Sequence, residues 1–173
     1  MALVQTFNFS FINPQTNQPV NSGPSPHSLL FQGLNLLVDV SVASVYRQGA
    51  NPLPLKTLQV FAHVDTGASI TCIGSDVASE LGIPPTGVSP SNTAGGIVNN
   101  PNYCIDLAFM GTAARLKGFQ NLQVGSCPLP YVHTLHATNN TDPRNFGVLI
   151  GRDVLSTWMF VWNGPTSIVS IAD

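Results

Sequence analysis

The segment that most constrains this chain is LQVFAHVDTGASITCIG, Leu58–Gly74, in which one acid, Asp65, follows an apolar stretch. The residues before it favour extended backbone and predict a core strand that ends at Asp65. The simplest interpretation of the acid is a turn cap: backbone N–H groups bond its carboxylate, and Gly67 takes a positive φ. The alternative is that Asp65 is a functional acid, and other parts of the sequence distinguish the two interpretations.

Short strands dominate the pattern along the chain and predict an all-β, barrel-like fold. The two expected helices are short: one over residues 75–82, with Ser75 as its N-cap and Gly82 at its end, and one that follows Asp153. No alternation of strands with long helices and no internal repeat is visible. The strands are expected at residues 1–12, 37–42, 58–64, 70–73, 103–110, 116–125 and 147–150, and in a hairpin over 159–172.

The chain divides into two parts by composition. Residues 13–28 are rich in Pro, Asn and Ser and predict a loop or arm. We therefore expect an N-terminal strand with a flexible arm over residues 1–30 and a single folded domain over residues 31–173.

Low charge excludes several classes of function. Charged residues make up 8% of the chain and the net charge is -2, with no basic cluster of the kind that binds nucleic acid. No apolar run approaches the roughly 20 residues that span a membrane, and the N-terminus does not resemble a signal peptide. Three irregularly spaced cysteines predict reduced thiols rather than disulfides, with Cys72 as a small core residue. The expected location is cytoplasmic.

Neither a metal nor a cofactor is expected. His133 and His136 have helix-like spacing, but no glutamate accompanies them in the way that a zinc helix requires. His63 lies two residues before Asp65 and is interpreted as a packed side chain rather than a catalytic one.

A second turn changes the interpretation of Asp65. About 80 residues later, the apolar strand Gly147–Ile150 runs into Gly151-Arg152-Asp153 and a short helix. The chain therefore resembles the retropepsin-like, or retroviral-type, aspartic proteases in three motifs. These are VDTGAS (Val64–Ser69), the glycine-containing segment SNTAGGIVNNPNY (Ser91–Tyr103) and VLIGRDVL (Val148–Leu155). The resemblance implies a closed barrel of the acid-protease fold, with one lobe per chain.

The resemblance also implies roles for individual residues. Asp65 would be the catalytic carboxylate, Thr66 would form hydrogen bonds across the subunit interface, and Gly67 would let the loop approach the substrate. Gly151, Arg152 and Asp153 would form a structural second turn. Members of the family often carry an acid at the position of Ser69, where it meets the arginine, so Asp153 and Asp76 are the alternative partners for Arg152.

The resemblance implies substrate contacts as well. Ala68, Ser69 and Leu149 would line the cleft, and the small residues Thr93, Ala94, Gly95 and Gly96 would form a flap that opens and closes over it. An ordinary exposed hairpin tip is the alternative interpretation of the flap segment.

One DTG per chain has a consequence for function. Hydrolysis by this chemistry needs two carboxylates that share a proton, so the second one has to be Asp65 of another subunit in a two-fold homodimer. We expect an aspartic endopeptidase that acts on polypeptides. The alternatives are a catalytically silent peptide-binding module of the same fold and, less favoured, a capsid-like β-sandwich.

Overall fold

Strands carry most of the regular structure in the computed structural model, which describes residues 4–8, 34–93, 96–109, 118–127, 146–163 and 168–172. The strand expected within residues 1–12 is present as β1 (Val4–Asn8). The arm expected at residues 13–28 lies outside the described residues.

Six strands close into a barrel. Around the barrel they follow one another in the order β2 (Asn35–Val42), β3 (Thr57–Val64), β8 (Val148–Ile150), β4 (Cys72–Gly74), β7 (Phe119–Cys127) and β6 (Gly96–Phe109). Pairing of β6 with β2, in which Val40 lies opposite Leu107, closes the circle. The predicted all-β, closed-barrel fold is therefore confirmed.

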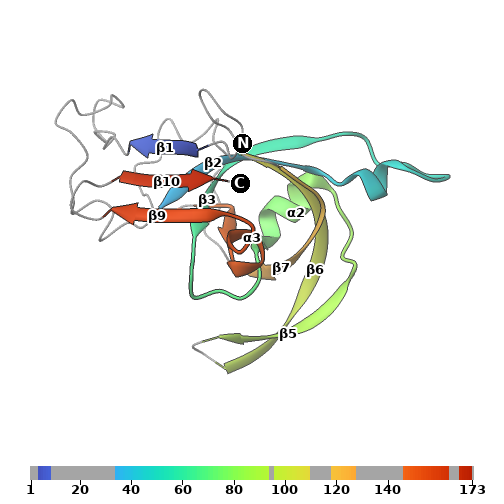
Figure 1. Cartoon of the computed structure of the whole chain (residues 1–173). Coiled ribbons are helices and arrows are strands. Elements are labelled where there is room, and N and C mark those ends of the chain that lie inside the picture. The colour runs from blue at the N-terminus through green and yellow to red at the C-terminus, as the bar shows by residue number, and fades with distance from the viewer. Residues whose placement is uncertain are drawn as a thin grey trace, which may run out of the picture.

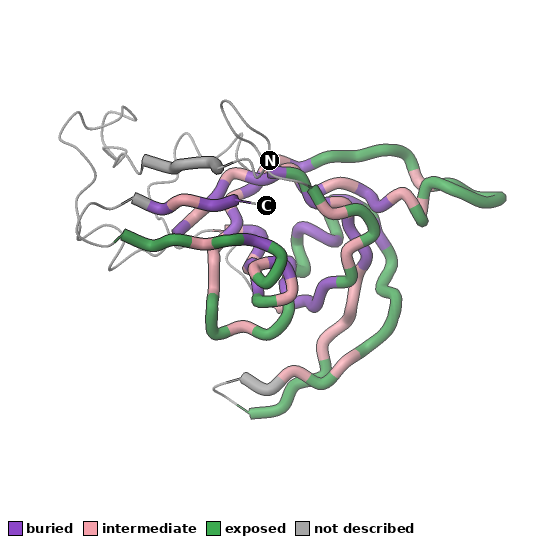
Figure 2. Tube along the Cα trace, in the orientation of Figure 1, coloured by how far each residue is buried: buried purple, intermediate pink, exposed green. Residues whose placement is uncertain are grey.

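Alternating side chains place the core inside this barrel. Buried and partly buried residues alternate along β2, and its antiparallel register with β3 sets Val38 opposite Val60, both of them fully buried. Apolar residues at every second position therefore meet on the inner face. Figure 2 shows the buried residues gathered at the centre of the molecule.

A small second sheet lies beside the barrel. It has the order β1, β10 (Ile168–Ala172) and β9 (Met159–Asn163), and both pairs are antiparallel. Figure 1 shows the three strands side by side, with the two chain ends close together. The predicted C-terminal hairpin is thus confirmed, and the N-terminal strand pairs with its second strand.

A long hairpin formed by β5 (Gly87–Thr93) and β6 projects from the barrel. In Figure 1 it curves away from the core, and Figure 2 shows its outer half exposed. The sequence pattern predicts a strand only from Tyr103, whereas β6 begins at Gly96. The difference arises because this half of the hairpin is exposed and its two apolar residues, Ile97 and Val98, are adjacent, so it lacks the apolar alternation that marks a buried strand.

The helices are short, as expected. Those in the described residues are the 3-10 helix η1 (Ser44–Arg47), α2 (Ser75–Leu81) and α3 (Arg152–Leu155). Gly82 ends α2 with a φ of 72°, the left-handed conformation that glycine adopts without a steric penalty. The prediction that Ser75 caps the helix is wrong, since Gly74 occupies the cap position and no side chain bonds there.

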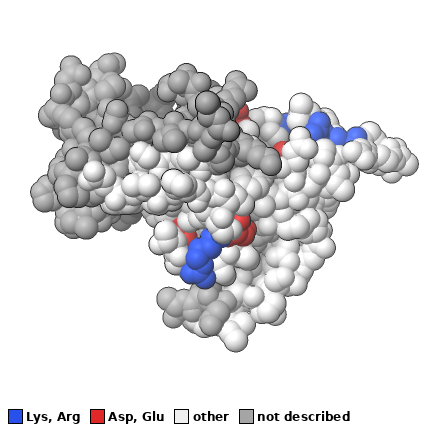
Figure 3. All heavy atoms as spheres, viewed as in Figure 1, with Lys and Arg blue, Asp and Glu red and all other residues white. Residues whose placement is uncertain are grey.

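The visible face of the molecule is mostly uncharged (Figure 3). One ion pair is found in the described part of the chain, between Arg47 and Asp106 at 3.2 Å. No helix among the described residues is both long enough and apolar enough to cross a membrane.

Two isoleucines of β6 test where the stability of the barrel originates. Ile105 is fully buried, whereas Ile97 is 76% exposed. Ile105→Ala is expected to lower the free energy of unfolding by about 2–5 kcal/mol, because it removes packed methyl groups and leaves a cavity. Ile97→Ala should change it by less than about 0.5 kcal/mol. Urea denaturation at one protein concentration measures both values, and similar losses in the two variants would contradict this placement of the core.

Candidate active site

The loop that follows β3 holds Asp65 through its backbone. The N–H of Asp65 donates to the carbonyl of Ile150 in β8 (3.0 Å), which continues the parallel β3–β8 pairing by one residue. The carbonyl of Asp65 accepts the N–H of Ala68 (3.3 Å) and closes a turn. Asp65 therefore sits where a buried strand opens into a loop, and it is partly exposed.

One oxygen of the Asp65 carboxylate is held by the turn itself. The N–H of Gly67 donates to Oδ1 at 2.8 Å, so the predicted capping contact is present. The positive φ predicted for Gly67 is wrong: Gly49, Gly82 and Gly96 are the described glycines with that conformation. A glycine still suits this position, because a Cβ on Gly67 would lie 3.0 Å from Oδ1 of Asp65.

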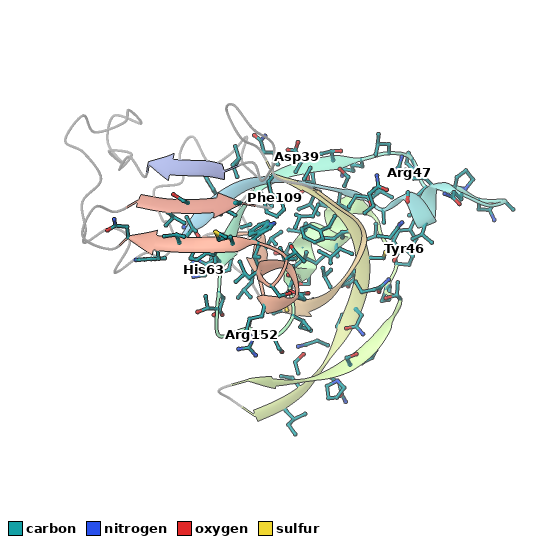
Figure 4. All side chains as sticks on the ribbon, viewed as in Figure 1. Asp39, Tyr46, Arg47, His63, Phe109 and Arg152 are labelled. Atoms are coloured by element: carbon teal, nitrogen blue, oxygen red, sulfur yellow. The ribbon has the colours of Figure 1, made fainter. Side chains whose placement is uncertain are left out.

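The second turn packs directly against the first. The backbone N–H of Arg152 donates to the carbonyl of Ala68 (3.0 Å). Its guanidinium Nη1 donates to the carbonyl of Thr66 (3.2 Å) and makes a longer contact with that of Gly67 (3.5 Å). Figure 4 shows the side chain of Arg152, the first residue of α3, on the side where the β5–β6 hairpin lies. The expected structural turn thus braces the DTG loop.

The expectation that Arg152 pairs with Asp153 or Asp76 is wrong within the described residues. Arg152 bonds backbone carbonyls of the DTG loop instead, and Asp153 accepts hydrogen bonds from Thr71. Backbone acceptors are present whatever the side chains are, so a sequence motif does not reveal them.

Thr71 is the residue that the sequence interpretation missed. It is fully buried, and its hydroxyl donates to Oδ1 of Asp153 (2.8 Å) while its N–H donates to Oδ2 (2.9 Å). The same hydroxyl accepts the N–H of Gly151 (3.1 Å). Thr71 therefore ties the end of the DTG loop to the second turn. The sequence pattern predicts a strand over residues 70–73, in which a threonine is an ordinary residue, whereas β4 begins only at Cys72.

Gly151 is required by close packing. A Cβ at this position would lie 2.4 Å from the carbonyl carbon of Ile70 and 2.9 Å from the N of Thr71. Any larger residue would push the two turns apart. The resemblance gave Gly151 a structural role, and this contact supplies a physical reason for it.

The residues expected to line the cleft belong to the DTG loop and to β8. Ala68 and Leu149 are partly buried, and Ser69 is exposed. Leu149 lies opposite His63 in β3 and opposite Cys72 in β4.

Thr93 and Gly96, two of the expected flap residues, lie at the end of the β5–β6 hairpin. Thr93 pairs with Gly96, whose φ is 113°. Ala94 and Gly95 lie outside the described residues.

His63 behaves as the packed residue that was expected. Its ring stacks on Phe146 with 4.9 Å between ring centroids, and its Nδ1 lies 2.9 Å from Oδ1 of Asn35. Burial lowers the pKa of His63, although the charge of Asp65 opposes this effect. The stacked imidazole is therefore neutral at neutral pH and places no positive charge near Asp65.

Comparison with known proteins agrees with this arrangement of two turns. A model of the aspartyl protease family matches residues 56–154, more than half of the chain. The chain belongs to the aspartyl protease family. The matched range includes both the DTG loop and the second turn, so the resemblance predicted from the two motifs is confirmed.

Two further comparisons, with solved structures and with curated protein sequences, give less information about the family. Among solved structures, the chain is similar to a retropepsin-like aspartic protease from Rickettsia conorii. The sequence identity is 12% and the TM-score 0.46, and the match covers 99% of this chain and 94% of that one. No curated protein sequence matches the chain.

Removal of one hydroxyl tests the role of Thr71. Thr71→Val keeps the shape of the side chain but leaves the N–H of Gly151 without its acceptor and removes one of the hydrogen bonds that the Asp153 carboxylate accepts. We expect it to lower the free energy of unfolding by about 1–3 kcal/mol. Thr71→Ser retains the hydroxyl and should cost less. Urea denaturation compares the two variants, and an equal or larger loss in Thr71→Ser would show that the methyl group, not the hydroxyl, matters.

Proposed function

We propose that the chain is an aspartic endopeptidase in which Asp65 and Asp65 of a second subunit activate one water molecule. The observation that carries the proposal is the bracing of the DTG loop. Backbone hydrogen bonds from Asp65 to Ile150 and from Arg152 to Ala68 hold the acid at the end of β3. The N–H of Gly67 orients its carboxylate by a further hydrogen bond. A structural cap alone would not need a second turn to hold it from the opposite side.

The remaining described acids do not offer the second carboxylate. Asp153 is engaged by Thr71, Asp106 pairs with Arg47, and Asp39 accepts a hydrogen bond from Gln59 in the barrel wall. Asp76 and Glu80 lie on α2. A dyad therefore requires a second copy of the chain, related by a two-fold axis that passes between the two loops.

The small sheet supports such an assembly. Its edge strand β9 exposes three large apolar side chains, those of Met159, Val161 and Trp162. Figure 2 shows β9 as largely exposed. Met159 and Val161 lie on one face of β9 and Trp162 on the other. Exposed apolar groups mark surfaces for protein contact, and an edge strand offers backbone groups to a partner. This edge is therefore the surface proposed for contact with the second copy.

The proposed reaction follows from two like charges held close together. Two neighbouring carboxylates cannot both ionise easily, so the pair shares one proton. The ionised carboxylate takes a proton from water as the water oxygen attacks the peptide carbonyl, and the protonated carboxyl donates to the carbonyl oxygen. The tetrahedral intermediate then collapses with transfer of a proton to the leaving nitrogen. Neither a metal nor a cofactor takes part.

The substrate is proposed to be an extended polypeptide. Ala68, Ser69 and Leu149 would contact it from the barrel. Thr93, Ala94, Gly95 and Gly96 would lie over it at the tip of the β5–β6 hairpin. An extended chain pairs its backbone with strand edges, and β5 is an edge strand in the described sheet. Thr66 is proposed to join the two loops across the dimer.

The domain limits and location remain part of this proposal. The protease domain would comprise residues 31–173, and residues 1–30 would form an N-terminal strand and arm. The family match lies entirely within this domain. Described cysteines are free thiols, which supports a cytoplasmic location.

Loss of one charge tests the catalytic role of Asp65. Asp65→Asn should reduce cleavage of a denatured protein substrate by at least about 10²–10⁴-fold, the range attributed to acid–base groups. Sedimentation should still show a dimer. Asp76→Asn, which changes an exposed aspartate on α2, is the matched control and should keep full activity. Normal cleavage by Asp65→Asn would exclude the dyad, whereas inactivity of the wild type would favour the peptide-binding alternative.

Mixing of subunits tests whether the site is shared. When wild type is equilibrated with an excess of Asp65→Asn, each wild-type chain enters a dimer with only one Asp65. Activity per wild-type chain should therefore fall toward zero as the excess grows. Added Asp76→Asn should not lower it. Activity that stays constant per wild-type chain would show that a single chain contains a complete site.

A further inference from the structure

Two of the three cysteines face one another across neighbouring strands. Cys72 begins β4 and Cys127 ends β7, and these strands pair in parallel. In their register Cys72 lies opposite Gly125, and Cys127 lies opposite Gly74. The two cysteines are therefore diagonal neighbours on one face of the sheet, and each has a glycine as its direct partner.

The glycine partners create the space for this contact. A Cβ on Gly125 would lie only 3.2 Å from Sγ of Cys72, so the thiol occupies the volume that a side chain at position 125 would fill. Cys72 and Cys127 are both partly exposed, whereas Cys104 is buried. The prediction of Cys72 as a core residue is therefore wrong, and a small solvent molecule can reach this pair.

The two thiols are chemically unequal. A hydrogen bond from the Cys127 thiol lowers the pKa of Cys72, against the opposing effects of burial and of the nearby charge of Asp153. The same contact, together with burial, raises the pKa of Cys127. Cys72 is thus the thiol that ionises more readily, and Cys127 is the one that more readily keeps its proton. Thiolates react with peroxides, whereas protonated thiols do not.

We propose that Cys72 and Cys127 form a modification site at which hydrogen peroxide produces a reversible disulfide. The Cys72 thiolate attacks one peroxide oxygen, the O–O bond breaks, and the released hydroxide takes up a proton to form water. This leaves a sulfenic acid on Cys72. The sulfur of Cys127 then attacks that sulfur and displaces hydroxide, which takes the Cys127 proton and leaves as a second water. In total, two thiols give two electrons to peroxide and become one disulfide.

The disulfide would act on the loop that carries Asp65. Cys72 directly follows Thr71, the anchor of Asp153, and its thiol contacts the carbonyl of Ile70 at 3.8 Å. That carbonyl lies against Gly151 of the second turn. Oxidation removes the thiol hydrogen and draws Cys72 toward β7, because diagonal strand neighbours are ordinarily farther apart than disulfide-bonded residues. The bracing of the DTG loop is thereby disturbed. This consequence for activity rests on the proposed function, but the thiol chemistry does not.

Counting of thiols tests the site without any measurement of proteolysis. Purified wild type has three thiols, and peroxide treatment should leave one, with a Cys72–Cys127 disulfide identified by peptide mapping under non-reducing conditions. Cys104→Ser should also lose two thiols. Cys127→Ser should form no intramolecular disulfide, and a sulfenic-acid trapping reagent should label it at Cys72. A disulfide that involves Cys104, or trapping at Cys127 in Cys72→Ser but none at Cys72, would overturn the proposal.

Proteolysis tests the consequence separately. In the wild type, cleavage of a denatured substrate should fall in proportion to the disulfide formed and return after treatment with dithiothreitol. Cys127→Ser, which cannot form the disulfide, is treated with peroxide and then with dithiothreitol before the same assay. Any activity that it loses permanently measures general oxidative damage, which dithiothreitol would not reverse. Full activity of the disulfide form would contradict the proposal that oxidation lowers proteolysis. Absence of activity in every form would instead contradict the proposed function and leave the thiol result to stand by itself.

Discussion

The hydrogen bond from the N–H of Asp65 to the carbonyl of Ile150 is the contact on which the rest of the site depends. It extends the parallel pairing of β3 with β8 by one residue beyond the strand end. Because of it, two loops far apart in sequence leave the barrel at the same place. This bond holds the ends of β3 and β8 side by side, and Arg152, two residues after Ile150, is then within reach of the DTG loop.

A second layer of contacts, centred on Thr71, keeps the two turns together. Thr71 uses its hydroxyl twice, as a donor to Asp153 and as an acceptor from Gly151, and a buried group satisfied in both directions costs little. Gly151 allows the backbones to approach closely enough for these bonds. Asp153 also accepts the N–H of Val154 in the first turn of α3. Two backbone segments, the end of the DTG loop and residues 151–154, are thus joined through one threonine and one aspartate.

The sequence predicted those features that depend on side-chain pattern. Alternating apolar residues in β2 and β3 revealed the barrel wall, and two short motifs revealed both turns. The start of β6 could not be predicted, because backbone pairing with β5 forms it and its exposed residues carry no apolar alternation. The partners of Arg152 were missed because they are carbonyl oxygens. Thr71 was missed because a threonine beside a strand has an ordinary structural explanation.

The choice of carbonyls as partners for Arg152 has a physical consequence for an enzyme of this class. A dyad that must retain one proton is expected to work best where carboxylates begin to take up protons. An arginine–carboxylate brace would weaken under the same conditions, since protonation removes the negative partner. The carbonyls of Thr66 and Gly67 do not titrate, so their bonds to Arg152 persist. Serine at position 69, where relatives often carry an acid, therefore does not deprive the DTG loop of its support.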